Sequence, residues 1–128
     1  MTAPAWMNAV IADFGRAAGA DKLALGASGA ATLRFANGAS LRLEYTGDEL
    51  VVAIVTAHTL FGAQPIRRLL ALANPKVAGQ MRMRAGIMPK TGTAVIAMRM
   101  PERDVTLPAL NSTFSVLWRA MDEIGGVQ

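Results

Sequence analysis

The spacing of apolar residues predicts a helix near the start of the chain. We expect it to cover Ala3 to Ala18, with Thr2 as the N-cap. Pro4 falls in the first turn, where a missing N–H costs little, and Gly19 is a natural end. Four residues recur at helical spacing and form the predicted buried stripe: Trp6, Val10, Phe14 and Ala17.

The clearest helical pattern lies near the other end of the chain. We expect a helix over Leu107 to Ile124, with Thr106 as its N-cap and the Gly125–Gly126 pair closing it. Its apolar residues alternate spacings of three and four, which is typical of one buried face: Leu107, Leu110, Phe114, Leu117, Met121 and Ile124.

Alternating apolar and polar residues predict three strands after the first helix. In the first hairpin, a three-residue loop with Gly38 in the left-handed conformation places Leu33 opposite Leu41. A two-residue turn at Gly47–Asp48 then pairs the second strand with the third. Six apolar side chains share one face in this register: Leu41, Leu43, Tyr45, Leu50, Val52 and Ile54.

The third strand is apolar on its other face as well. Val51, Ala53 and Val55 alternate with the residues that point to the first face. This pattern favours a central strand, or a strand that is covered on both sides. A loop is expected next, over His58 to Ala63, and then a short helix over Gln64 to Ala73.

A second hairpin is predicted between the short helix and the last helix. Its strands contain Met81 to Ile87 and Ala94 to Met100. A four-residue loop, Pro89 to Gly92, pairs Ile87 with Ala94 and Met83 with Met98, which gives one apolar face. Five methionines lie in this hairpin: Met81, Met83, Met88, Met98 and Met100. They fit ordinary core packing and an adaptable interface equally well.

These elements predict an α+β fold with an antiparallel sheet, in the order helix, three strands, helix, two strands, helix. The 128 residues fit a single domain, residues 1–128, and 52% of them are hydrophobic, enough for one core. The first 19 residues do not resemble a signal peptide, because Asp13 interrupts them and no basic segment precedes. No apolar run approaches the roughly 20 residues that span a bilayer, so we expect a soluble protein without membrane insertion.

The chain offers little for catalysis. His58 is its single histidine and it has no cysteine, so a histidine-based triad or a zinc site would lack partners. Six of the nine carboxylates form three close pairs at predicted turns and at a helix end: Asp48 and Glu49, Glu102 and Asp104, and Asp122 and Glu123. Gly26 and Gly29 precede a strand, so they do not form a phosphate-binding loop. We therefore expect no enzyme, no cofactor and no metal.

The net charge of +4 draws attention to arginines on the predicted strands. Arg34 and Arg42 share the polar face of the first sheet segment. Arg82, Arg84 and Arg99 share that of the second, with Arg82 opposite Arg99. A solvated face and a docking surface for an acidic ligand or nucleic acid both remain open. No aromatic residue alternates with these arginines, which argues against nucleic acid.

The element order resembles that of the class I type III secretion chaperones, the Tir chaperone (CesT) family. The resemblance extends over the whole chain. It rests on five segments: the helix with Trp6, Val10 and Phe14; the hairpin around 33–38; the strand 50–55; the short helix 65–70; and the last helix. It implies a bacterial cytoplasmic homodimer that holds the N-terminal segment of a secreted effector in extended form, without catalysis, nucleotide or metal.

The resemblance also implies two binding surfaces. The dimer interface would comprise residues of the short helix and of the following strand: Ile66, Leu69, Leu70, Met81, Met83, Ala85 and Ile87. The effector would bind beside the first helix and the edge of the first strands: Trp6, Val10, Phe14, Leu33, Phe35, Arg34 and Arg42. These chaperones are usually acidic, whereas this chain has a pI of about 10.4. Either the effector segment is acidic, or the chain is a relative with another role.

Overall fold

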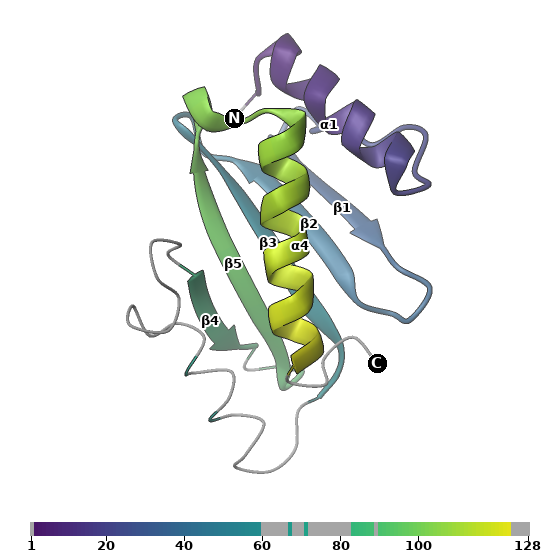
Figure 1. Ribbon diagram of the computed structural model, residues 1–128, viewed down its shortest axis with the longest axis vertical. Coiled ribbons are helices and arrows are strands. Elements are labelled where there is room, and N and C mark those ends of the chain that lie inside the picture. The colour runs from purple at the N-terminus through teal and green to yellow at the C-terminus, as the bar shows by residue number, and fades with distance from the viewer. Residues whose placement is uncertain (1, 60–66, 68–70, 72–82, 89, 124–128) are drawn as a thin grey trace.

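The computed structural model describes residues 2–59, 67, 71, 83–88 and 90–123. The first half of these contains α1 (Ala5–Ala17), β1 (Ala30–Arg34), β2 (Ser40–Tyr45) and β3 (Glu49–Thr59). The second half contains β4 (Met83–Ile87), β5 (Thr93–Pro101), the short 3-10 helix η1 (Glu102–Asp104) and α4 (Leu107–Glu123). The predicted α+β class with an antiparallel sheet is confirmed (Figure 1).

The described strands form one five-stranded sheet in the order β1-β2-β3-β5-β4. The two predicted sheet segments are joined because β3 pairs with β5, for example Val52 with Met98. This makes β3 the central strand, as its two apolar faces predicted. β1 and β4 lie at the two edges.

Both predicted hairpin registers of the first three strands are confirmed. Leu33 lies opposite Leu41, and the loop between these strands is closed by the Phe35 N–H, which donates to Ala39 O at 2.9 Å. Gly38 has a φ of 92°, the left-handed conformation that this loop requires. In the next hairpin Tyr45 pairs with Leu50, as the two-residue turn predicted.

The second hairpin also has its predicted register. Met83 pairs with Met98 and Ile87 with Ala94, and the Met88 N–H closes the loop by donating to Thr93 O. Met81 and Arg82 lie outside the described residues.

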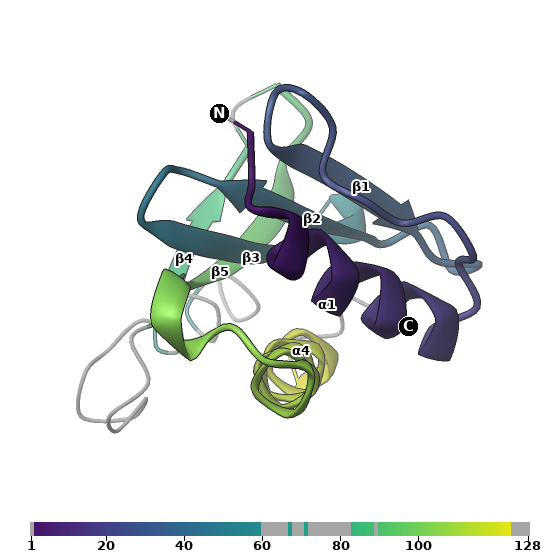
Figure 2. The ribbon, with the colours of Figure 1, turned by 90° about the horizontal axis from the view of Figure 1, so that it is seen from above.

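The two described helices α1 and α4 pack on the same face of the sheet (Figure 2). We call this the inner face, and its opposite the outer face. The core lies between the inner face and the helices, where the alternating strand residues meet the helical stripes. Its fully buried side chains include Met7, Ile11, Leu41, Leu43, Leu50, Ile54, Ile96, Leu110, Leu117 and Met121. At the start of α4, the predicted N-cap is confirmed, because Thr106 Oγ1 accepts the Ala109 N–H at 3.2 Å.

The prediction for the first helix was wrong in two respects. Pro4, not Thr2, is the N-cap, and the helix ends at Ala17. The buried stripe is also rotated by one residue, about 100°. Of the predicted stripe, Phe14 is buried as expected, whereas Trp6 is 46% exposed and Ala17 is exposed. Beside Phe14 the helix buries Met7, Ile11 and Gly15.

Gly15 explains this rotation. A Cβ at Gly15 would lie 2.6 Å from Leu23 Cβ and 2.8 Å from Ala20 O, so the glycine side of α1 is pressed against the segment that follows it. The Leu25 N–H also donates to Asn8 Oδ1 at 2.8 Å, which ties the same segment to α1. These two contacts fix which side of the helix faces inward.

The predicted loop after the third strand was placed too early. His58 and Thr59 belong to β3, where Thr59 pairs with Thr93 after a register shift that follows Val55. The shift breaks the apolar alternation, so the strand's end carries no sequence signal. Of the predicted helix over 64–73, Arg67 and Ala71 are helical, and its other residues lie outside the described ones. Ile124, Gly125 and Gly126, the predicted end of the last helix, also lie outside the described residues.

Candidate partner-binding surfaces

β1 has β2 as its strand neighbour and forms an edge of the sheet. Hydrogen-bonded and non-hydrogen-bonded pairs alternate along an antiparallel ladder. Because Phe35 N–H bonds to Ala39 O, the Leu33–Leu41 pair is also of the hydrogen-bonded kind. The N–H and C=O groups of Thr32 and Arg34 therefore point to the open edge, where an added strand could pair with them.

A cluster of aromatic side chains lies at the end of this edge. Phe35 follows β1, and its ring centroid is 5.0 Å from that of Trp118 and 5.8 Å from that of Phe114, both on α4. Phe14 of α1 joins the cluster edge-on to Phe114 at 5.6 Å. We call these four residues the aromatic cluster. Phe35, Phe114 and Trp118 are only half-buried, so the cluster presents apolar area to solvent.

The sequence predicts a binding role for two members of the aromatic cluster and not for the other two. Phe14 and Phe35 were predicted effector residues, whereas Phe114 was assigned to the last helix's core face and Trp118 to no site. The signal available for Trp118 was its position one residue beyond Leu117, at the margin of the apolar stripe. Phe35 and Trp118 are far apart in the sequence, so the sequence does not predict their contact.

The remaining predicted effector residues differ in exposure. Trp6 is 46% exposed on α1, and Val10 and Leu33 are half-buried against the core. Phe14 is only 3% exposed, so it supports the surface from beneath. Arg34 and Arg42 are exposed, but they point to the outer face.

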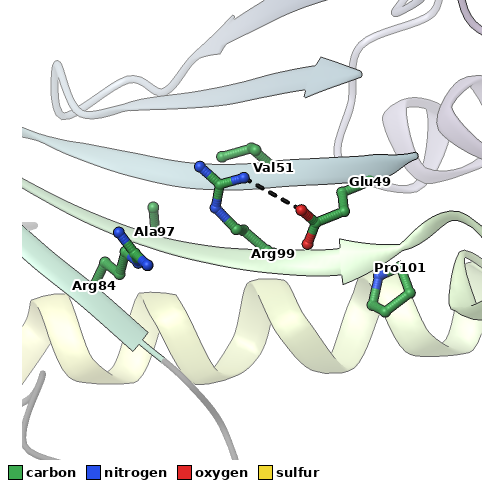
Figure 3. Close-up of a pocket in the computed structure, with 6 residues that line it drawn as sticks. All are labelled: Glu49, Val51, Arg84, Ala97, Arg99 and Pro101. Carbon is green, nitrogen blue, oxygen red and sulfur yellow. Dashed lines mark hydrogen bonds and ion pairs between the residues drawn. The ribbon is translucent and has the colours of Figure 1, made fainter. Parts of the chain in front are cut away.

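The pairing of β3 with β5 brings the two predicted arginine groups onto one face. Paired residues of antiparallel strands point to the same side, and Arg42, Ala53, Ala97 and Arg84 form one row across four strands. Arg99 lies on the same face and its Nη1 is 3.3 Å from Glu49 Oε1 (Figure 3). Arg82, its predicted opposite, lies outside the described residues.

The predicted dimer residues are described only in part. Met83 is buried, Ala85 is half-buried and Ile87, at the end of edge strand β4, is 39% exposed. Met83, Met98 and Met100 belong to the core, which favours ordinary packing for these three methionines. Four of the predicted interface residues lie outside the described ones: Ile66, Leu69, Leu70 and Met81.

Tyr45, the last residue of β2, forms hydrogen bonds that hold two segments of the fold together. The Tyr45 hydroxyl lies 2.8 Å from Gly47 O and 2.9 Å from Glu102 Oε1, and so joins the β2–β3 turn to η1. Burial, reinforced by the hydrogen bond to Glu102 and by the charges of Glu102 and Asp48, raises the pKa of Tyr45 above 10.0. The sequence predicts Glu102 only as a turn carboxylate, because its contact with Tyr45 joins residues that are 57 positions apart.

The described residues contain no group of three or more side chains that could hold a metal ion. No helix formed by them is long and apolar enough to cross a membrane. What the described surface offers instead is an open strand edge, a half-exposed aromatic cluster and an arginine-bearing sheet face.

The chain is similar to known proteins in sequence and in fold. Residues 6–125 match the family of the type III secretory system chaperone SycN. No curated protein matches the chain by sequence.

Several solved structures share the fold. A chain of the ExsC–ExsE complex superposes with a TM-score of 0.77 at 18% identity, over 99% of this chain and 97% of that chain. A chain of the HopA1–SchA chaperone–effector complex gives 0.68 at 21% identity, over 90% and 89%. A chain of the ExoU–SpcU complex of the Pseudomonas aeruginosa type III secretion system gives 0.63 at 18% identity, over 91% and 93%.

Proposed function

Because the chain belongs to the family of the type III secretory system chaperone SycN, we propose that it binds the N-terminal chaperone-binding segment of a secreted effector. It keeps that segment extended and competent for secretion, and escorts it to the secretion apparatus. The fold is shared with a chain of a structure described as a chaperone–effector complex, which supports this function. The protein acts in the bacterial cytoplasm by binding and not by catalysis.

The observation that best supports this proposal is the open edge of β1 beside the aromatic cluster. The outward N–H and C=O groups of Thr32 and Arg34 can pair with an extended segment, which supplies affinity that is independent of its sequence. Phe35 and Trp118 at the end of the edge can receive an apolar side chain of that segment and so supply selectivity. The exposed Trp6 on α1 offers a further apolar contact.

A homodimer is part of the proposal. Ile87 is one of two large hydrophobic side chains that are exposed among the described residues, and it lies on edge strand β4, at the opposite edge from β1. Dimerisation through β4 would therefore leave the β1 edge of each copy free for an effector.

Substitution of Thr32 by proline tests the effector site. Thr32→Pro removes an N–H that faces the open edge, so the bond to an added strand is lost while the ladder to β2 keeps its own bonds. We expect the affinity for the effector that co-purifies with the chain to fall about tenfold or more. Co-expression and titration calorimetry measure this.

Thr32→Val is the matched control, because it keeps the N–H and suits an exposed strand position. Both variants should keep a melting temperature close to that of the unsubstituted protein. Unchanged effector binding by a folded Thr32→Pro variant would sink the proposed strand pairing.

A further inference from the structure

The outer face of the sheet contains an apolar trough along β3 and β5. Its floor is made of short side chains: Val51, Ala53, Val55, Val95 and Ala97. Neither α1 nor α4 covers this face, because both pack on the inner one (Figure 2). A hollow of about 270 Å³ lies over part of this floor, at Val51 and Ala97 (Figure 3). Its other lining residues are Glu49, Arg84, Arg99 and Pro101. A contiguous apolar surface with a polar rim is typical of a binding site.

Arginines border the trough on both sides. The row Arg42, Ala53, Ala97, Arg84 crosses it, with one arginine on β2 and the other on β4. Neighbouring strands lie about 4.8 Å apart, so the backbones that bear the two arginines are about 14 Å apart. Arg34 lies diagonally across from Arg42 on the same side.

The described part of this face has an excess of positive charge. It contains four arginines and two carboxylates: Arg34, Arg42, Arg84, Arg99, Glu44 and Glu49. One of the carboxylates, Glu49, is already paired with Arg99. Among the described residues, no carboxylate lies within ion-pair distance of Arg84 or Arg42. The complementary partner is therefore acidic at its margins and apolar at its centre.

The dimensions of the trough select the shape of that partner. An α-helix with its side chains is about 10 Å wide, so it covers both β3 and β5 and reaches arginines on either side. A single extended strand is about 5 Å wide and reaches one side only. Three successive floor positions on β3 span about 13 Å, which is the length of about nine helical residues.

Two other occupants fit less well. A second copy docked face to face would bring arginine-bearing borders together, which is unfavourable without an acid between them. Single-stranded nucleic acid would find no aromatic side chain on the floor for base stacking.

We infer that the trough is a docking site for an amphipathic helix of a partner protein, with Asp or Glu on both sides of its apolar stripe. The site lies on the opposite face of the sheet from the aromatic cluster. It is therefore separate from the proposed effector site, and both can be occupied at once.

A designed peptide tests this site directly. The probe has about 14 residues, leucines at positions i, i+3, i+4 and i+7, glutamates on both sides, and a hydrocarbon staple that holds it helical. Its partner probe has glutamine in place of every glutamate. We expect the acidic probe to bind at least about tenfold more tightly at low salt, and to weaken as salt is added.

Two variants locate the binding. The double substitution Arg42→Gln and Arg84→Gln should weaken the acidic probe about fivefold to tenfold, whereas Arg119→Gln, an exposed arginine of α4, should not change it. Circular dichroism checks that all variants fold.

Four binding outcomes overturn the inference. They are no binding of the acidic probe at low salt, equal binding of the glutamine probe, binding that survives the double substitution, and tighter arginine-dependent binding of a mixed-sequence oligonucleotide. If the double variant dissociates from a dimer while Ile87→Lys does not, the face is covered by a second copy of the chain and the inference is overturned.

Discussion

At the scale of single residues, a glycine and a tyrosine hold neighbouring segments of the fold together. Gly15 allows α1 to approach the segment that leads to β1, and Tyr45 fastens the β2–β3 turn to η1. Neither role follows from hydrophobic periodicity. The close approach at Gly15 depends on a contact with Leu23 and Ala20 across a turn, and Tyr45 meets Glu102 across 57 residues of sequence.

Gly15→Ala should destabilise the protein by about 1–2 kcal/mol. Alanine normally favours a helix by about 1 kcal/mol, but the added Cβ would meet Ala20 O at 2.8 Å, a backbone atom that cannot turn aside. Urea unfolding measures the change. Gly86→Ala is the control, since nothing lies within 4 Å of the added Cβ there, and it should be close to neutral. Equal or higher stability for Gly15→Ala would contradict the close packing of α1.

Tyr45 should make the stability of the protein depend on alkaline pH. Its pKa is raised in the folded state, so the folded protein holds the phenolic proton more tightly than the unfolded chain does. The stabilisation is complete below the ordinary tyrosine pKa of 10.0 and is lost as the pH rises through the folded pKa. Unfolding measured from about pH 8 to 11 should show this decline, and Tyr45→Phe should reduce it.

Tyr45 is the single tyrosine of the chain, so ultraviolet titration of the phenolate reports it directly. A midpoint below 10.0 in the folded protein would be inconsistent with this account.

At the scale of elements, the hairpins were predictable and the contacts between distant elements were not. Gly38 and Gly47 set the turns, and the two-residue alternation of the strands then leaves one register that buries the apolar set. Pairing of β3 with β5 has no such local signal, because β3 is apolar on both faces. The join between the sheet segments, and with it the common arginine face, therefore appeared only in the structure.

The rotation of α1 was missed for a physical reason. Trp6 is the largest side chain of the helix, yet Met7 and Ile11 are fully buried and Trp6 is 46% exposed. The close contact at Gly15 orients the helix so that Phe14 faces inward and Trp6 does not. A large exposed aromatic is consistent with a binding surface, which periodicity alone assigns to the core.

At the scale of the whole molecule, the sheet separates two surfaces. The predicted resemblance to type III secretion chaperones is confirmed by the family match over residues 6–125. The inner layer presents the aromatic cluster next to the β1 edge, while the outer face presents arginines around an apolar trough. Four of the chain's 13 lysines and arginines, Arg34, Arg42, Arg84 and Arg99, lie on that outer face.

Ile87→Lys should convert the proposed dimer into a monomer. Exposure of Ile87 at the end of β4 suggests that it is covered in the assembly, and a lysine there would lose apolar burial and add like charges across the interface. We expect the dissociation constant of the dimer to rise about 100-fold, as measured by light scattering over a range of concentrations. Trp6→Ser, on α1, should leave the mass unchanged. A monomeric unsubstituted protein at micromolar concentration would contradict the dimer.

The most direct test of the central claim is amide hydrogen exchange of the chain with and without its effector segment. The account predicts that the amides of Thr32 and Arg34, which point to the open edge of β1, exchange quickly in the free protein and become protected on binding. Leu33, already bonded to β2, serves as the internal reference. If the effector binds while the amides of Thr32 and Arg34 continue to exchange at their free rates, the effector does not add to β1 and the account is wrong.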